Sequence, residues 1–197
     1  MNIEKTIKNL KLRGFQVTHF ATGKEAADYL CGAINGTAVG IGGSKTVDDL
    51  GLYDRLCENN EVFWHWKSSD AKTTREKANA APVYLTSANA ISEAGEILNI
   101  DGTGNRLAAQ VYGSKKVYII AGTNKICPDF ESALYRARNI AAVKNCARFN
   151  NNNPCKLDGK CHDCRMPTRI CNALLVLWGP MSGMQTEVVL IDEELGF

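Results

Sequence analysis

The sequence lacks several features that would point to a membrane or a nucleic acid. No apolar run approaches the roughly 20 residues that a membrane-spanning helix needs. Lysine and arginine number 23 against 21 aspartate and glutamate, a net charge of +2, and no basic run or RNA-binding aromatic motif is present. Residues 1–15 place Ile3, Ile7 and Leu10 on one helical face instead of forming a continuous apolar signal core. We therefore expect a cytoplasmic protein with no membrane span and no nucleic-acid partner.

The sequence also lacks an internal repeat and a linker rich in glycine, serine and proline. Its 197 residues, 45% hydrophobic and 22% charged, have the ordinary composition of a globular domain with a sizeable core. Strands are expected at 15–20, 37–42, 61–66, 82–89, 97–104, 116–122, 173–179 and 186–197. Helical patterns separate most of them. This alternation predicts an α/β fold, with a mostly parallel open sheet and helices on both faces.

Three helical segments are the clearest. Thr22 followed by Glu25 has the pattern of a capping box that opens a helix. Residues 69–81 predict a polar, exposed helix that Pro82 ends, and residues 129–147 predict the longest helix, with an apolar stripe. We expect one domain over residues 1–197.

Cysteine is concentrated near the end of the chain. Four of the eight cysteines fall within residues 154–171, and they are Cys155, Cys161, Cys164 and Cys171. A C-x2-C pair flanked by two further cysteines can supply four thiolates to a metal. In a reducing compartment this favours a metal over free thiols or a disulfide switch. We therefore expect a cysteine-rich, metal-binding loop at about residues 146–172, with Cys146 and His162 as reserve ligands.

The spacing of these cysteines does not identify the metal. It matches neither a zinc ribbon nor the C-x2-C-x2-C run of a bacterial ferredoxin. Spacing alone favours structural zinc, and an iron–sulfur cluster is the alternative.

A glycine-rich loop, GIGGSKT at residues 40–46, follows an apolar strand and opens a helix. Gly42 and Gly43 would let the backbone approach a ligand, while Ser44 and Thr46 would add donors. The loop is neither a Walker A motif nor a GxGxxG motif. It predicts a small-anion site, and a turn that needs glycine for its dihedral angles is the alternative.

Polar residues also follow three further expected strands, and open α/β sheets bind ligands at the carboxyl ends of their strands. These residues are Asn89, Ser92, Glu93, Asn105, Arg106 and Lys125. An arginine at a helix start is disfavoured by the helix dipole, so Arg106 is expected to bind an anion or to pair with Glu93 or Glu96. The strand ends together predict a pocket for a small anionic metabolite, with Asn89, Asn105, Arg106 and Lys125 among its ligands.

Several segments resemble the lactate-utilisation (LUD) domain family over about residues 1–197. They are GGSKT, DLGL, ANAISEAGEILNIDGTGNR, VYIIAGTNKI, DFESALYRAR and the cysteine pattern. The resemblance implies a fold in the superfamily of ribose-5-phosphate isomerase A, glucosamine-6-phosphate deaminase and coenzyme A transferases. It also implies a role beside iron–sulfur partner subunits in lactate oxidation, which moves the expected metal toward a cubane iron–sulfur cluster.

The superfamily suggests a catalytic residue. SEAG at residues 92–95 resembles the Ser-Glu-Asn-Gly segment whose glutamate attacks acyl-CoA in one class of coenzyme A transferases, which would make Glu93 a nucleophile. Ala94 departs from that motif, and a structural Glu93 paired with Arg106 is the alternative. Three functions are therefore weighed: a subunit or accessory factor of a lactate-oxidising system, a stand-alone phosphosugar or acyl-CoA enzyme that uses Glu93, and a metal-braced interaction module.

Overall fold

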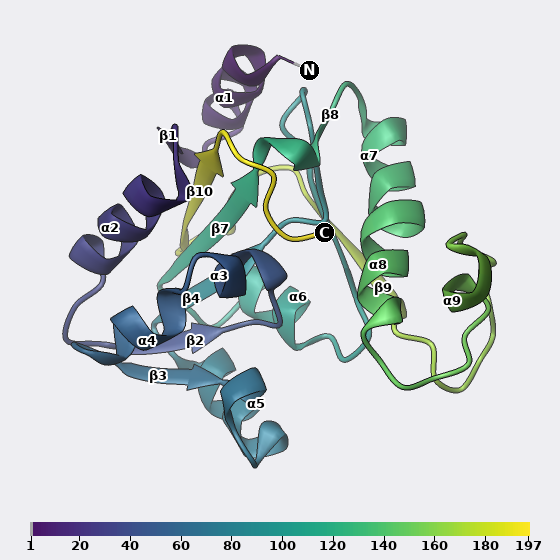
Figure 1. The fold of residues 1–197 in the computed structure, drawn as a ribbon. Coiled ribbons are helices and arrows are strands. Elements are labelled where there is room, and N and C mark those ends of the chain that lie inside the picture. The colour runs from purple at the N-terminus through teal and green to yellow at the C-terminus, as the bar shows by residue number, and fades with distance from the viewer. Residues whose placement is uncertain (1) are drawn as a thin grey trace.

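The computed structural model describes residues 2–197 and contains two β-sheets packed among helices (Figure 1). All six strands of the larger sheet are parallel, in the order β1-β10-β7-β4-β2-β3. They are β1 (Gln16–Phe20), β2 (Ala38–Ile41), β3 (Glu61–Trp64), β4 (Val83–Ser87), β7 (Lys116–Gly122) and β10 (Gln185–Ile191). The predicted α/β fold is confirmed.

The smaller sheet has four strands in the order β8-β5-β6-β9. They are β5 (Ala90–Ser92), β6 (Ile97–Asp101), β8 (Ile126–Cys127) and β9 (Ala173–Leu177). The sequence did not predict this second sheet. A tight turn, closed by the N–H of Ser92 donating to the carbonyl of Glu96, makes β5 and β6 antiparallel and diverts the chain from the larger sheet.

Helices cover both sheets. They are α1 (Ile3–Leu12), α2 (Gly23–Ala33), α3 (Lys45–Asp49), α4 (Leu52–Cys57), α5 (Ala71–Ala80), α6 (Asn105–Val111), α7 (Phe130–Arg136), α8 (Ala142–Ala147) and α9 (Cys155–Asp158). Short 3-10 turns lie at His65–Lys67 and Thr123–Lys125, and a π-helical segment, Ala137–Ala141, joins α7 to α8. None of the helices within residues 2–197 has the length and apolar character of a membrane span.

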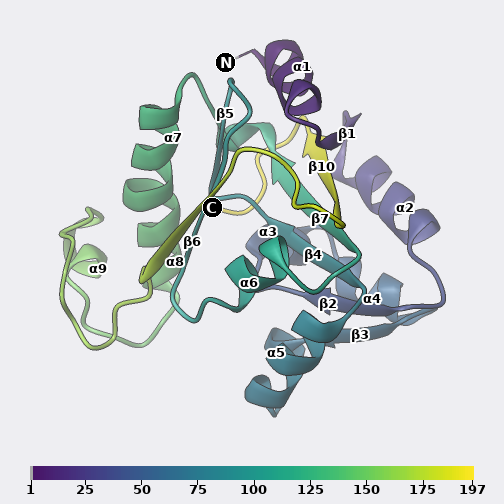
Figure 2. The same cartoon turned by 180° about the vertical axis from the view of Figure 1, so that it is seen from behind.

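Two clusters of buried apolar side chains pack the helices onto the two faces of the larger sheet. Leu85 and Ile120 point from the larger sheet toward α2, α3 and α4, while Tyr84 and Ile119 point to the other face, toward α1, α5, α6 and the smaller sheet. The far side of the smaller sheet packs on α7 (Figure 2). Central strands buried on both faces are typical of parallel sheets.

One local feature predicted from the sequence is present, and the predicted length of the last strand is wrong. Thr22 and Glu25 form the predicted capping box, each side chain accepting a hydrogen bond from the other's backbone N–H. The strand expected at 186–197 is too long, because β10 ends at Ile191. Residues 192–197 instead cross the carboxyl edge of the sheet, where the N–H of Gly196 donates to Asp49 over 3.0 Å. This crossing segment helps to enclose the cavity described next.

Candidate functional site

A cavity of about 520 Å³ opens at the carboxyl ends of the parallel strands. This volume is within the usual range for small-molecule sites, about 300–1,000 Å³. The predicted ligand-binding residues that line it are Gly43, Ser44, Thr46, Asn89, Asn105, Arg106 and Lys125. Gly42 is not among its lining residues, because its N–H donates to the carbonyl of Leu85 over 3.0 Å within the sheet.

The glycine-rich loop shapes the cavity mainly by leaving room. A Cβ atom at Gly42 would lie 2.8 Å from Cγ of Arg106, so a glycine is needed for the Arg106 side chain to pass. Ser44 caps α3 by accepting a hydrogen bond of 3.2 Å from the N–H of Val47. The Ser44 side chain therefore serves the helix, while Thr46 reaches the buried Lys125.

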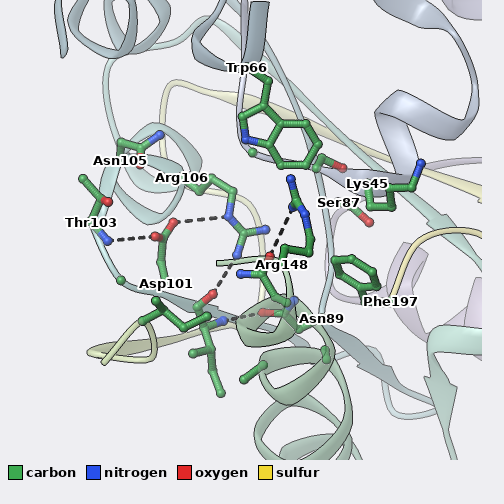
Figure 3. A pocket seen from close by; sticks show the side chains of 18 of the residues that line it. Lys45, Trp66, Ser87, Asn89, Asp101, Thr103, Asn105, Arg106, Arg148 and Phe197 are labelled. Carbon is green, nitrogen blue, oxygen red and sulfur yellow. Dashed lines mark hydrogen bonds and ion pairs between the residues drawn. The ribbon is translucent and has the colours of Figure 1, made fainter. Parts of the chain in front are cut away.

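Arg106 is paired, but not with the expected residues. Its Nε donates to Asp101 over 3.2 Å and its Nη2 donates to the carbonyl of Ile100 over 2.7 Å (Figure 3). Its Nη1 group makes no protein hydrogen bond within residues 2–197. The predicted pairing with Glu93 or Glu96 is wrong, since both glutamates lie in or beside the β5–β6 turn and contact α1 and the residue after it.

Glu93 lies outside the cavity. Its carboxylate accepts hydrogen bonds from the backbone N–H of Asn2, over 2.7 Å, and from Lys5 Nζ, over 3.0 Å. These donors, Lys5 foremost, lower the pKa of Glu93. Glu96 pairs with Arg13. The contacts made by Glu93 hold α1 against the β5–β6 turn, and its catalytic role stays a prediction.

Lys125 is buried at the floor of the cavity, with 3% of its surface exposed. Its Nζ donates to Thr46 Oγ1 over 2.7 Å and to Ser87 Oγ over 2.8 Å. The two hydroxyls are themselves 3.1 Å apart. Burial, with Arg136 and Arg106 nearby, lowers the pKa of Lys125 to about 7. A buried ammonium without a carboxylate partner is costly, so much of this amine is neutral near neutral pH.

Asn89 lines the cavity but is held by the backbone. Its Oδ1 accepts from the N–H of Ile100 over 2.6 Å, and its carbonyl accepts from Arg136. Arg136 also donates to the carbonyls of Asn124 and Phe197, so it ties the strand ends to the crossing segment. Asn105 is the first residue of α6, after Gly104.

Several side chains that line the cavity were not predicted from the sequence. Arg148, the residue directly after α8, places its guanidinium 3.9 Å from the Trp66 ring centroid and 5.8 Å from that of Phe197 (Figure 3). His65 Nδ1 is buried, and no residue within 2–197 hydrogen-bonds to it. Burial, with Arg75 adding, lowers the pKa of His65 to about 4, so His65 is neutral at pH 7. His65 and Trp66 directly follow a strand, and this position could have predicted that they lie at the carboxyl edge of the sheet.

The cavity is strongly basic. One acidic side chain, Asp101, lines it. Six basic side chains line it: Lys45, Arg75, Arg106, Lys125, Arg148 and Arg169. Lys45 is neutralised by Asp48 and Asp49, over 3.0 and 2.6 Å. The remaining excess of positive charge makes the cavity suited to an anion.

The cysteine loop gathers its thiols at a second, smaller cavity of about 20 Å³. The cysteines that line it are Cys146, Cys155, Cys161, Cys164 and Cys171. Burial and the neighbouring thiol of Cys146 raise the pKa of Cys155 to about 11. As placed, no group of three or more His, Cys, Asp or Glu side chains in residues 2–197 is arranged to hold a metal ion. The thiol chemistry fits a metal, but ligation would require the thiols to move relative to one another, and metal binding stays a prediction.

The two cavities share a wall, because Ala142, Arg169 and Ile170 line both of them. Arg169 donates to the carbonyls of Cys164, over 2.8 Å, and Cys171, over 3.0 Å, and so shapes the cysteine loop from within. A change in the conformation of the cysteine loop would therefore also move residues that line the basic cavity.

The fold and site together define an α/β protein with a basic pocket at the carboxyl edge of a parallel sheet and a cysteine loop beside it. The model of the LUD domain family matches residues 3–191, and the chain belongs to that family. It is similar to a DUF162 family protein from Deinococcus radiodurans, known from a crystal structure. The identity is 13%, the match covers 96% of this chain and 95% of that one, and the TM-score is 0.58, which shows a shared fold. No curated protein matches the chain.

Proposed function

We propose that the chain binds a small carboxylate in the basic pocket, as a lactate-utilisation protein, and that a cysteine-bound metal ion braces the pocket wall. The observation that carries the proposal is the charge of the pocket. Arg75, Arg106 and Arg148 line one cavity, and Asp101 is the single acidic side chain among its lining residues. Nη1 of Arg106 is a donor left over for a ligand, and arginine suits a planar carboxylate.

Membership of the LUD domain family supports the choice of a lactate-related carboxylate over other anions. Membership of this family also supports a role for the chain beside iron–sulfur partner subunits in lactate oxidation. The alternative is acyl-CoA or phosphosugar chemistry at Glu93. The contacts of its carboxylate with Asn2 and Lys5 support a structural role at α1 instead.

The size of the cysteine cavity supports a single ion. At about 20 Å³ it has room for about one water-sized object. Four thiolates can hold one tetrahedral zinc ion, whereas a cubane cluster needs more room than this cavity has. We therefore favour zinc over the iron–sulfur cluster that the family resemblance suggested. The ion would be held by Cys155, Cys161, Cys164 and Cys171, and its chemistry there would be to fold the loop and fix Arg169.

Isothermal titration calorimetry tests the pocket. L-lactate and pyruvate are expected to bind, and Arg148→Ala to weaken that binding about tenfold, since a charged hydrogen bond contributes about 1.5–3 kcal/mol. Arg55→Ala is the matched control, because Arg55 pairs with Asp28 on the surface outside the pocket lining. Tighter binding of ribose 5-phosphate than of either carboxylate would instead support the phosphosugar function, and no binding of any anion would contradict the proposal.

A further inference from the structure

The floor of the basic pocket holds a group that anion binding alone does not explain. Lys125 Nζ is buried against two hydroxyls, Thr46 Oγ1 at 2.7 Å and Ser87 Oγ at 2.8 Å. An ammonium kept only to attract an anion would gain from remaining charged. Here Arg106 and Arg136 lie near enough to oppose that charge, and no carboxylate of residues 2–197 hydrogen-bonds to the amine.

Two carboxylates beside the pocket, Asp49 and Asp101, are paired with other groups. Asp49 pairs with Lys45 over 2.6 Å and accepts from the N–H of Gly196 over 3.0 Å. Asp101 pairs with Arg106 and accepts from the N–H of Thr103 over 3.1 Å. Because its surroundings disfavour the ammonium form, Lys125 can present a lone pair to the cavity.

We infer that Lys125 is a nucleophile that forms an imine with the carbonyl carbon of a 2-oxo carboxylate bound in this pocket. The inference rests on the proposed function, since the pocket's arginines would hold the carboxylate and a 2-oxo acid is what oxidation of a 2-hydroxy acid yields. The reacting site is assembled at the ends of three strands. Thr46 lies in α3 after β2, Ser87 is the last residue of β4, and Lys125 lies in the 3-10 turn after β7.

The reaction balances without an oxidant or a reductant. The Nζ lone pair attacks C2 of the 2-oxo acid, and one amine proton moves to the carbonyl oxygen to give a carbinolamine. The second amine proton then moves to the same oxygen, the C–O bond breaks, and water leaves as the C=N bond forms. Ser87 and Thr46 are placed to carry these protons between nitrogen and oxygen, because each hydroxyl is within hydrogen-bond distance of Nζ and of the other.

Reductive trapping tests the inference. The protein is incubated with pyruvate and cyanoborohydride at pH 7.5, digested, and its peptides are mapped by mass spectrometry. The expected result is one reduced adduct, on Lys125. Lys45→Arg is the matched control, because Lys45 lines the same cavity but is paired with Asp48 and Asp49. It should keep the Lys125 adduct, whereas Lys125→Arg should lose it.

Two further measurements keep the result unambiguous. If Lys125→Arg fails to fold by circular dichroism, Ser87→Ala replaces it, and trapping at Lys125 should slow about tenfold. Acetone, which lacks the carboxylate, should be trapped at least about tenfold more slowly than pyruvate. Equal rates for the two ketones, or adducts spread over the exposed lysines, would overturn the inference.

Calorimetry on the same samples separates this inference from the proposed function. Pyruvate that binds without forming an adduct on Lys125 would overturn the imine and leave the carboxylate pocket standing. Absence of both binding and adduct would overturn both.

Discussion

The backbone N–H of Asn172 donates a hydrogen bond of 2.9 Å to the carbonyl oxygen of Asp101. The Asn172 side chain also donates to the carbonyl of Gly102 over 3.0 Å. Asn172 directly follows the last cysteine of the loop, and Asp101 is the ion-pair partner of Arg106. The cysteine loop and the basic pocket are therefore joined by the hydrogen bonds between Asn172 and residues 101–102. We expect a structural change in either one to alter the other.

Gly102→Ala tests that connection. A Cβ atom at Gly102 would lie 2.7 Å from the carbonyl oxygen of Ile170 and 3.0 Å from its Cα, so the cysteine loop must shift. We expect a loss of about 1–3 kcal/mol in the free energy of unfolding, as for overpacked sites. Hydrogen exchange over residues 154–172 should become faster, and pyruvate affinity measured by calorimetry should fall.

Gly32→Ala is the matched control. A Cβ atom there meets nothing within 4 Å, and the residue lies inside α2. It should stabilise the protein by up to about 1 kcal/mol, because alanine favours a helix over glycine. Unchanged exchange in the cysteine loop of Gly102→Ala would contradict the coupling.

Much of the site could be predicted from the sequence because parallel strands bring their carboxyl ends to one edge. Residues as distant as Thr46, Asn89 and Lys125 therefore meet in one cavity. What could not be predicted depends on elements that leave the parallel pattern. The β5–β6 turn places Glu93 against α1, where it binds Lys5, and so Glu93 does not pair with Arg106. Arg148 enters from the end of a helix, where no local pattern distinguishes it from a surface arginine.

The cysteine loop shows a different limit. Spacing predicted that four thiols would gather, and they line one cavity together with Cys146. Spacing does not determine the distances between the sulfurs, because these depend on how Arg169 and Asn153 hold the loop. Asn153, buried, donates to the sulfur of Cys146 over 3.4 Å and to the carbonyl of Thr168 over 2.9 Å.

Cys164→Ser tests the metal. Elemental analysis of protein purified anaerobically should find about one zinc per chain in the wild type and none in the variant, because one thiolate of four is lost. A brown protein that absorbs at about 400 nm would show that the loop holds an iron–sulfur cluster instead of zinc. Hydrogen exchange should rise over residues 146–172 while the strands keep their protection, since their core is separate.

The control for the cysteine variant is Cys57→Ser, an exposed cysteine at the end of α4 outside the loop. It should leave the metal content and the exchange pattern unchanged. A wild-type protein with neither zinc nor iron, or a Cys164→Ser variant that keeps its metal, would contradict the metal site.

The buried amine of Lys125 predicts a pH dependence of stability. Its pKa is about 7 in the folded protein and about 10.4 when exposed in the unfolded chain. Between these values the unfolded state binds more protons, so stability should rise with pH, by at most about 1.4 kcal/mol per pH unit. Below pH 7 the full cost of burying the ammonium remains. Urea unfolding at intervals from pH 6 to 10 measures the slope.

Lys125→Met isolates this contribution, because methionine fills similar space without a titrating group. The difference in unfolding free energy between wild type and variant should change over the same pH range, while slopes from cysteines and tyrosines cancel. Parallel pH curves for the two proteins would show that Lys125 keeps its proton when folded, and would also weaken the case for its nucleophilic role.

The last prediction separates a structural Arg106 from one that binds ligand. Arg106→Leu, Asp101→Asn and the double variant form a cycle around a pair that is mostly buried, with 12% and 11% of the side chains exposed. Arg106→Leu should cost about 1–3 kcal/mol of stability, because within residues 2–197 it leaves the Asp101 carboxylate with the backbone donors of Thr103 and Gly104 alone. The coupling energy should be about 1 kcal/mol or more, as for residues in contact. Arg55→Leu, which breaks the exposed pair with Asp28, should cost less than about 1 kcal/mol.

Binding then decides the role of Arg106. If its free Nη1 group holds the carboxylate, Arg106→Leu should weaken pyruvate binding about tenfold. Asp101→Asn should keep or strengthen that binding, since it removes the one negative charge lining the pocket while retaining an acceptor for the backbone. An Arg106 that only supported the fold would give the opposite pattern: both single variants would lose affinity together, in proportion to their loss of stability. Calorimetry on the four proteins, at a temperature where each is folded, distinguishes the two.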